Sequence, residues 1–362
     1  MSGNPSSVHY INYLSLDKVL NAQNPLSHEK GGEAHEEMLF IIIHQTYELW
    51  FKQIIHELNS AMVLFEADKI DESNIGVIVG RMDRVNKIMT TLVGQLDILE
   101  TMTSLDFLDF RDYLSPASGF QSHQFRKIEV MLGLKIEKRH QFGGCPYHAQ
   151  FEGEKKEEIL NLEDNESLFN LVEKWLERIP FLNMDGFDFT KKYEDAVNDM
   201  LDNEISGIKS AQLTEDDRAL RIRMIDENRK YFERVLSETE HEKAVSNGET
   251  KLSHKATMSA LLINLYRDEP ILHSPYQFLR SLVELDHKIA SWRFRHVQMV
   301  EKMLGLKIGT GGSSGQGYLK KTVDKHKLFT DLANISTLMI SRTYLPALPK
   351  SIKDTLGFNY NK

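Results

Sequence analysis

The chain has 362 residues, of which 41% are apolar and 27% charged, and its formal net charge is −9. This composition is that of an ordinary globular protein, and the negative charge disfavours binding to a nucleic-acid backbone. The single cysteine, Cys145, excludes an internal disulfide or a multi-cysteine metal site and fits a reducing compartment. Neither a leader segment nor an apolar stretch long enough to cross a bilayer is recognised, so a cytoplasmic protein without membrane contact is expected.

Apolar residues spaced three or four apart predict two long amphipathic helices in the first hundred residues. The second of these helices is expected to follow Asp71, which is placed to act as its N-cap. The first stripe comprises Leu39, Ile43, Tyr47, Trp50, Ile54, Leu58, Met62 and Phe65, and the second comprises Ile75, Ile78, Met82, Val85, Ile88 and Leu92.

The middle of the chain reads as shorter helices separated by turns. Pro116 and Gly119 indicate a break, after which a helix is expected from Ser122 to Leu132, with Gly133 ending it. Beyond it, the sequence predicts an irregular, exposed excursion at about 135–165, helices at about 167–179 and from 190, and a solvated helical pair at 214–243.

The clearest helical pattern in the chain comes after Pro275. Its apolar stripe runs without a gap through Leu282, Leu285, Ile289, Trp292, His296, Met299 and Met303. No convincing β alternation, internal repeat or low-complexity tract accompanies it. The fold class predicted from the residues is therefore all-α.

Two histidines lie on apolar helical faces. A single histidine such as His296 is more often a buried neutral residue than a ligand, although a rigid helix facing an apolar slot is also what an axial haem ligand requires. His44 shares its face with Phe40, Tyr47 and Phe51. Two such histidines on separate helices can flank a flat cofactor or can both be core residues, and spacing alone does not decide between these alternatives.

Arg111 follows two phenylalanines and is flanked by Asp109 and Asp112. It can form an ion pair with an aspartate or bind the carboxylate of a ligand, and the flanking acids favour the first interpretation. The segment 309–315 (GTGGSSG) matches neither a Walker loop nor a dinucleotide fingerprint. It is either a flexible linker or a loop that closes over a polar ligand through backbone N–H groups and the Thr310 hydroxyl.

A rival metal site is a non-haem di-iron centre, because Glu-x-x-His spacing on paired helices is its signature. That spacing occurs at Glu137/His140, Glu238/His241 and Glu284/His287. The first pair falls in the irregular excursion, the second on a face expected to be solvated, and the third off the neighbouring apolar stripe. Such short matches arise by chance in an acidic chain, so the di-iron interpretation is weak. No His-Glu-x-x-His zinc motif is present.

Four blocks of sequence carry a resemblance to a known family. They are residues 10–17 (YINYLSLD), 44–54 (HQTYELWFKQI), 115–126 (SPASGFQSHQFR) and 295–315, which contains RHVQMV, MLG and GTGGSSG. In this order they resemble the motifs of the tryptophan 2,3-dioxygenases, and the resemblance covers nearly the whole chain.

The resemblance implies a helical domain over residues 1–362 that binds haem b and assembles as a homotetramer. It also implies a reaction, the insertion of both atoms of O₂ across the indole C2–C3 bond of L-tryptophan to give N-formylkynurenine, the first step of the kynurenine pathway. Haem enzymes that act on other indoles are a related alternative. An N-terminal arm at residues 1–20 and a charged accessory helical region at about 205–255 complete the expected organisation.

The resemblance also implies roles for individual residues. His296 would be the proximal ligand of the haem iron, and His44 would lie on the distal side, where it hydrogen-bonds the indole N–H. Arg111 would bind the substrate carboxylate and Thr310 would approach the ammonium group. The remaining pocket residues would be Phe40 and Phe107 against the indole, Ser118 and Gly119 on the distal side, and Tyr10, Tyr13 and Leu14 from a neighbouring subunit.

Overall fold

The computed structural model describes residues 8–66, 72–134, 151–305, 307 and 326–357. Within these ranges the regular structure is helical apart from one antiparallel pair of two-residue strands, β1 (Asn183–Met184) and β2 (Phe187–Asp188). The all-α prediction is therefore confirmed. None of the helices in the described ranges combines the length and the apolar character that crossing a membrane would need.

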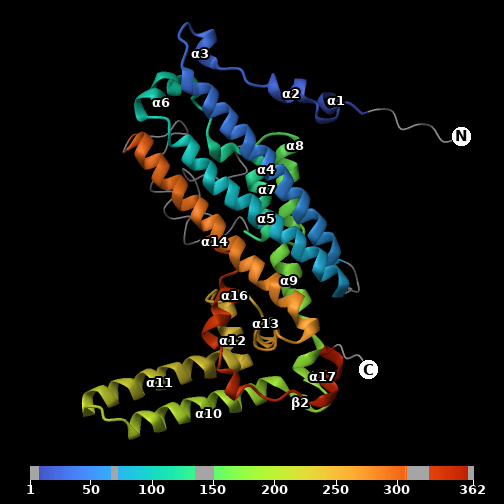
Figure 1. The fold of residues 1–362 in the computed structure, drawn as a ribbon, viewed down its shortest axis with the longest axis vertical. Coiled ribbons are helices and arrows are strands. Elements are labelled where there is room, and N and C mark those ends of the chain that lie inside the picture. Colours follow the sequence, from blue (N-terminus) through green and yellow to red (C-terminus); the bar gives the residue numbers. More distant parts are fainter. Residues whose placement is uncertain (1–7, 67–71, 135–150, 306, 308–325, 358–362) are drawn as a thin grey trace, which may run out of the picture.

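Three long helices form the body of the molecule: α4 (His35–Glu66), α5 (Glu72–Leu99) and α14 (Pro270–Leu304). They run along the long axis of the structure, and α5 packs against both of the others (Figure 1). The stripe predicted for α5 is fully buried, and its least exposed members are Ile75, Ile78, Met82, Val85 and Leu92. The Asp71 N-cap lies outside the described residues.

The predicted stripe of α4 is wrong at one position. Trp50 is 37% exposed, whereas its neighbour Phe51 is 4% exposed and faces the core. The Phe51 ring lies 5.4 Å from that of Phe125 and 6.4 Å from that of Trp292. Adjacent positions on a helix are only about 100° apart, so the packing partners decide which of the two aromatic residues is buried.

Two shorter helices follow α5, and both begin at side-chain caps. The hydroxyl of Thr103 accepts a hydrogen bond from the backbone N–H of Asp106 at the start of α6 (Ser104–Arg111), and Ser122 caps α7 (His123–Leu132) in the same way. Gly133 ends α7 with a φ of 115°, and a Cβ there would lie 2.9 Å from the Cβ of Phe169. The helix predicted between Ser122 and Gly133 is confirmed.

The predicted irregular excursion at 135–165 is partly wrong. Its second half contains the helix α8 (Glu154–Asp164), which packs against α7 through the fully buried Ile159. Its three apolar residues, Ile159, Leu160 and Leu162, lie close together among charged residues, and such a short cluster gives too weak a periodic pattern for a helix to be recognised. Residues 135–150 lie outside the described residues. The helix α9 (Leu168–Glu177) then begins at Ser167, as predicted.

The charged region forms an antiparallel pair of helices, but with boundaries other than those predicted at 214–243. The pair consists of α10 (Phe189–Ser210) and α11 (Glu215–Leu236), which lie side by side at one end of the molecule (Figure 1). Arg229 joins them by hydrogen bonds of 2.6 Å to Asn198 and to Asp202. The next helix, α12 (Glu238–Ser246), leads back to α13 (His254–Leu265).

The helix predicted after Pro275 begins five residues earlier, at Pro270, and contains Pro275. Pro275 has no backbone N–H, so one hydrogen bond of the helix is missing in its second turn. Pro270 occupies the first helical position, where the backbone N–H has no partner within the helix and a proline is therefore tolerated. Beyond residue 325 the chain returns along α14 in α16 (Thr330–Asn334) and ends with α17 (Lys350–Leu356). Within the described ranges the 3₁₀ turns are Asp112–Leu114, Gly119–Gln121, Pro180–Leu182, Ile335–Leu338 and Arg342–Tyr344.

The N-terminal segment contains α1 (Tyr10–Leu14), α2 (Leu16–Leu20) and α3 (Leu26–Glu29). The carboxylate of Glu37 accepts hydrogen bonds from the backbone N–H groups of Leu26 and Ser27, which joins α3 to α4. By contrast, α1 and α2 contain no buried residue and extend away from the body (Figure 1).

Candidate active site

His44 and Phe40 lie one turn apart on α4, with ring centroids 4.1 Å from each other. The Nδ1 nitrogen of His44 lies 2.7 Å from the carbonyl oxygen of Phe40. A carbonyl can only accept a hydrogen bond, so Nδ1 carries the proton and, in the neutral ring, Nε2 has a free lone pair.

The charge state of His44 follows from its surroundings. The side chain retains accessible surface, yet the protein crowds around the ring, and this desolvation lowers its pKa against the opposing effects of the Phe40 carbonyl and Glu48. A ring that contacts solvent on one side and protein on the other is both accessible and desolvated. His44 is therefore a neutral imidazole at pH 7, with Nε2 as a hydrogen-bond acceptor.

Three phenylalanines form an aromatic wall beside His44. The ring of Phe40 lies 5.8 Å from that of Phe107 and 5.6 Å from that of Phe110, and the two α6 rings lie 5.4 Å apart. Phe110 is fully buried, while Phe40 and Phe107 are half-buried and keep part of their ring surface accessible to a ligand. The structure thus brings together Phe40, Phe107 and His44, and it adds Phe110, which supports the other two rings from behind.

Arg111 is the last residue of α6 and lies one turn after Phe107. It is half-buried, and among the described residues no ion pair joins it to Asp109 or Asp112. The interpretation of Arg111 as the partner of a flanking aspartate is therefore wrong. A guanidinium next to an aromatic wall is suited to a carboxylate on an aromatic ligand.

Ser118 and Gly119 lie in the turn before α7. The Ser118 hydroxyl oxygen accepts a hydrogen bond of 3.3 Å from the backbone N–H of Phe120, so its own proton is available for donation. This turn is held to α4 by Glu48, whose carboxylate accepts hydrogen bonds of 2.6 Å from Ser122 and 2.9 Å from Gln124. Glu48 follows His44 by one turn, and its role as a link was not predicted from the sequence.

His296 lies on α14 and is half-buried. Its ring is stacked on that of Trp292, one turn earlier, with centroids 5.6 Å apart and an angle of 14° between the planes. Burial lowers its pKa to about 4, and the nearby His44 contributes to this shift. His296 is therefore neutral at pH 7. The helices α4 and α14 meet about one turn from the two histidines, where the rings of Tyr47 and Trp292 lie 6.1 Å apart.

The residues around His296 fit an axial ligand of a haem iron. Iron binds the neutral imidazole, and the lowered pKa keeps the ring in that form. Within the described ranges, the ring nitrogens of His296 have no hydrogen-bonding partner, so a lone pair is available to a metal. The alternative in which His296 is a buried histidine with a hydrogen-bond partner is not supported by these contacts.

Some predicted site residues do not join this cluster within the chain. Tyr10 and Tyr13 on α1 are 69% and 75% exposed, and Leu14 is 40% exposed, so all three lie on the separate N-terminal arm. Thr310 and the rest of the glycine-rich segment fall outside the described residues.

The rival metal motifs do not form a site in the described part of the chain. No group of three or more potential metal ligands is present there. Glu284 is ion-paired to Lys288 at 2.8 Å, and His241 is buried, where its Nε2 lies 2.9 Å from the carbonyl oxygen of Leu252. The prediction that the Glu238/His241 face is solvated is thus wrong for His241. The pair Glu137/His140 lies outside the described residues.

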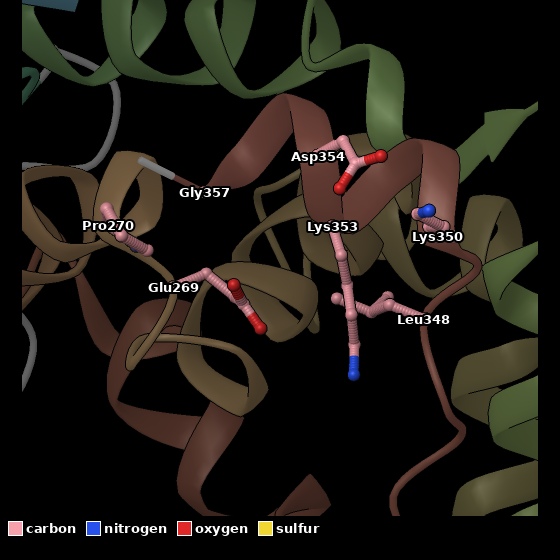
Figure 2. A pocket seen from close by; sticks show the side chains of 7 residues that line it. All are labelled: Glu269, Pro270, Leu348, Lys350, Lys353, Asp354 and Gly357. Carbon is pink, nitrogen blue, oxygen red and sulfur yellow. The ribbon is translucent and has the colours of Figure 1, made fainter. Parts of the chain in front are cut away.

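A pocket at the other end of α14 is separate from this cluster (Figure 2). One of the residues that line the pocket is Pro270, the first residue of α14, which precedes His296 by 26 residues. At a rise of about 1.5 Å per residue, this places the pocket about 39 Å from the imidazole. Its charged lining is mixed in sign: Glu269, Lys350, Lys353 and Asp354.

Comparisons with known proteins show the family of the chain. A model of the tryptophan 2,3-dioxygenase family matches residues 2–339. A protein named tryptophan 2,3-dioxygenase from Bdellovibrio bacteriovorus is 46% identical, over 98% of this chain and 99% of its own length. Proteins of the same name from Dictyostelium discoideum (47%, covering 98% and 89%) and Xenopus laevis (45%, covering 95% and 85%) are also similar. The chain belongs to the tryptophan 2,3-dioxygenase family.

Proposed function

We propose that this chain is a haem-dependent dioxygenase that inserts both atoms of O₂ across the indole C2–C3 bond of L-tryptophan. The product, N-formylkynurenine, contains every atom of tryptophan and of O₂, so the reaction needs no external reductant. The reaction is the first step of tryptophan degradation by the kynurenine pathway. The observation that carries the proposal is the neutral His44, whose acceptor nitrogen lies beside an aromatic wall.

His296 would hold the iron of haem b through its neutral imidazole. When bound, the haem supplies the activation of O₂, which none of the protein side chains provides. The stacking of His296 on Trp292 restricts rotation of the imidazole and thereby favours a fixed ligand direction.

The pocket side chains would bind and orient the substrate. Phe40 and Phe107 offer aromatic surface to the indole, and His44 accepts the hydrogen bond of its N–H through Nε2. Arg111 binds the carboxylate as a planar, permanently charged donor. Ser118 and Gly119 line the distal side, and Thr310 approaches the ammonium group.

Because the reaction joins O₂ to two particular carbon atoms, the position of the ring largely determines the rate. A hydrogen bond at the indole nitrogen, a wall on the ring and a cation at the carboxylate fix three separate points of one rigid molecule. The long helices that carry His44 and His296 are suited to this task, since packed helices hold side chains more firmly than loops.

We also propose a cytoplasmic homotetramer in which the N-terminal arm completes the pocket of a neighbouring subunit. The support is the exposure of apolar side chains on α1 and α2, which a single chain leaves uncovered. They are Tyr10, Ile11, Tyr13, Leu14, Val19 and Leu20. Such a row of exposed apolar residues on a projecting segment is typical of a surface that is buried in an assembly.

Isotope labelling tests the reaction directly. The haem-loaded protein is mixed with L-tryptophan and ¹⁸O₂, and the product is examined at once by mass spectrometry. The proposal predicts N-formylkynurenine with two labelled oxygen atoms. A product with a single label would indicate monooxygenation, and labelled hydrogen peroxide without an oxidised indole would indicate a different function.

A further inference from the structure

A buried ion pair joins α14 to α7 one turn before His296. The Nη2 nitrogen of Arg293 lies 2.6 Å from Oε1 of Glu129, and both residues are 5% exposed. The other oxygen of the same carboxylate, Oε2, lies 2.6 Å from Nη1 of Arg126. Each oxygen of Glu129 therefore faces a different guanidinium group.

Stability alone is a poor explanation for this arrangement. Removing charges from water is costly, and well-packed apolar residues of similar volume are commonly as stable as a buried ion pair or more so. An ion pair differs from an apolar contact in its geometry, because a guanidinium and a carboxylate bind each other in few orientations. The Glu129–Arg293 pair is therefore suited to fixing how α14 is placed against α7.

A second contact between the same two helices leads directly to His296. Phe125 precedes Glu129 by one turn on α7, and its ring lies 5.0 Å from that of Trp292. Trp292 in turn stacks on His296. The guanidinium of Arg293 also lies over the Phe125 ring, at 6.0 Å from its centroid. The ion pair and the aromatic contacts thus share Phe125.

Together, the two contacts restrain rotation of α14. Trp292 and Arg293 are adjacent, so their side chains leave the helix about 100° apart. The packing against α5 holds α14 along its length, and the two contacts with α7, made in different directions, further restrict small rotations of the helix near His296. His296 lies one turn further on and follows any such rotation.

We infer that the Glu129–Arg293 ion pair is a positioning device for His296, which fixes the direction in which its imidazole nitrogen is presented to the haem iron. The inference rests on the proposed function, in which His296 is the iron ligand. Arg293 acts through the helix and through Trp292, and it is therefore a positioning residue and not a catalytic one.

The first test uses R293K in the haem-loaded, reduced protein without substrate. Lysine retains the charge but cannot place a planar guanidinium over the Phe125 ring while one of its nitrogens contacts Glu129. Resonance Raman spectroscopy measures the iron–histidine stretching band, and transfer of haem to an excess of apomyoglobin measures its dissociation. We expect a shifted or broadened band and a haem dissociation rate increased roughly tenfold, the usual effect of losing a residue that orients a metal ligand.

The matched control is R295K. Arg295 is adjacent to His296 on the same helix, but its partners Asp97 (2.6 Å) and Glu100 (3.2 Å) belong to α5, and its side chain is 34% exposed. Its exchange should leave the band and the dissociation rate unchanged. An equal shift in R295K and R293K would mean that any charge near His296 has this effect and would overturn the inference.

A third variant, R126M/E129L/R293M, separates positioning from stability. Removing all three charged side chains together leaves neither Glu129 nor a guanidinium group of this cluster without its charged partner. The buried Asp286, which Arg293 also stabilises, keeps the positive charge of Lys251 and the backbone N–H groups of Leu328 and Phe329 as partners. We therefore expect this variant to fold, and urea unfolding compares its free energy of unfolding with that of the wild type. The inference predicts that its iron–histidine band is nevertheless displaced or broadened. A wild-type band in this variant and in R293K would overturn the inference alone. Absence of the band from the wild-type protein would instead overturn the assignment of His296, and the inference with it.

Discussion

The Nδ1 nitrogen of His44 lies 2.7 Å from the carbonyl oxygen of Phe40, which is the residue whose ring packs against the imidazole. A single residue thus sets both the tautomer of His44 and part of the aromatic wall. The consequence is an acceptor nitrogen beside a flat apolar surface, which is complementary to an indole N–H.

The H44A variant tests that complementarity. Haem should remain bound, because His296 is unchanged, but the preference for L-tryptophan over 1-methyl-L-tryptophan should shrink. A neutral hydrogen bond contributes about 0.5–1.5 kcal/mol, so kcat/KM for tryptophan should fall roughly two- to tenfold. Steady-state kinetics with both substrates measures this change.

The control for this variant is H56A, because His56 is an exposed histidine on the same helix, away from the pocket. It should retain wild-type kinetics. An unaltered preference between the two substrates in H44A would reduce His44 to a wall residue that makes no hydrogen bond to the indole.

The H296A variant should lose haem while keeping its helices. The side chain is half-buried at the edge of the core, so its truncation leaves most of the packing of α14 intact. Absorption spectroscopy of protein purified in the presence of haem measures occupancy, and circular dichroism measures helix content. The exposed His287 of the same helix provides the control, since H287A should bind haem fully. Full occupancy in H296A would refute the axial assignment.

The pKa of His296 makes the stability of the haem-free protein depend on pH. The pKa is lowered from 6.5 to about 4, so between these values the unfolded chain binds more protons than the folded one. Stability is therefore fully present above about pH 6.5 and is lost as the pH falls towards 4. The free energy of unfolding, measured with urea, should fall more between pH 7 and pH 5 in the wild type than in H296L. Equal losses would contradict a neutral, desolvated His296.

The R111A variant should weaken substrate binding and spare the haem. A charge-assisted hydrogen bond contributes about 1.5–3 kcal/mol, so KM for L-tryptophan should rise roughly 10- to 100-fold. Tryptamine has no carboxylate, and binding of this analogue, followed through the haem spectrum, should be similar in variant and wild type. An equal loss of affinity for both ligands would show that Arg111 acts on the shape of the pocket and not on the carboxylate.

Removing the exposed aromatic rings of the arm, in Y10A/Y13A, should leave the fold of each chain intact, because α1 contains no buried residue. If the arm completes a neighbouring pocket, KM for tryptophan should rise and the rate of haem loss should stay the same. Analytical ultracentrifugation at the assay concentration distinguishes a lost subunit contact from a local change in the pocket. Unchanged kinetics would exclude the arm from the site.

The sequence predicted the parts of the fold that depend on local pattern. The stripe of α5, the span of α7 with Gly133 at its end, and the start of α9 were predicted from local pattern, and the structure confirms them. The choice between Trp50 and Phe51 depended on rings contributed by α7 and α14, which periodicity along one helix does not contain. The start of α14 was missed because proline is usually a boundary and here lies inside the helix.

In the candidate site, too, contacts within one helix were predictable from the sequence, and contacts between helices were not. The grouping of Phe40 with His44, and of Phe107 with Arg111, follows from spacings of four residues along one helix. That α4 and α14, which carry His44 and His296, are in contact depends on tertiary packing, and within the sequence only the resemblance implied it. The Glu129–Arg293 pair spans 164 positions of the chain, and no local pattern predicts such a contact.

The most direct test of the account is an absorption spectrum of the haem-loaded, reduced protein under anaerobic conditions, recorded before and after addition of L-tryptophan and then of air. A haem dioxygenase that acts on tryptophan should show a Soret band that shifts with tryptophan, followed by the growth of N-formylkynurenine absorbance once oxygen enters. A Soret band that is absent even after reconstitution with haem would contradict the proposed function, and so would a band that tryptophan leaves unchanged and that yields no product.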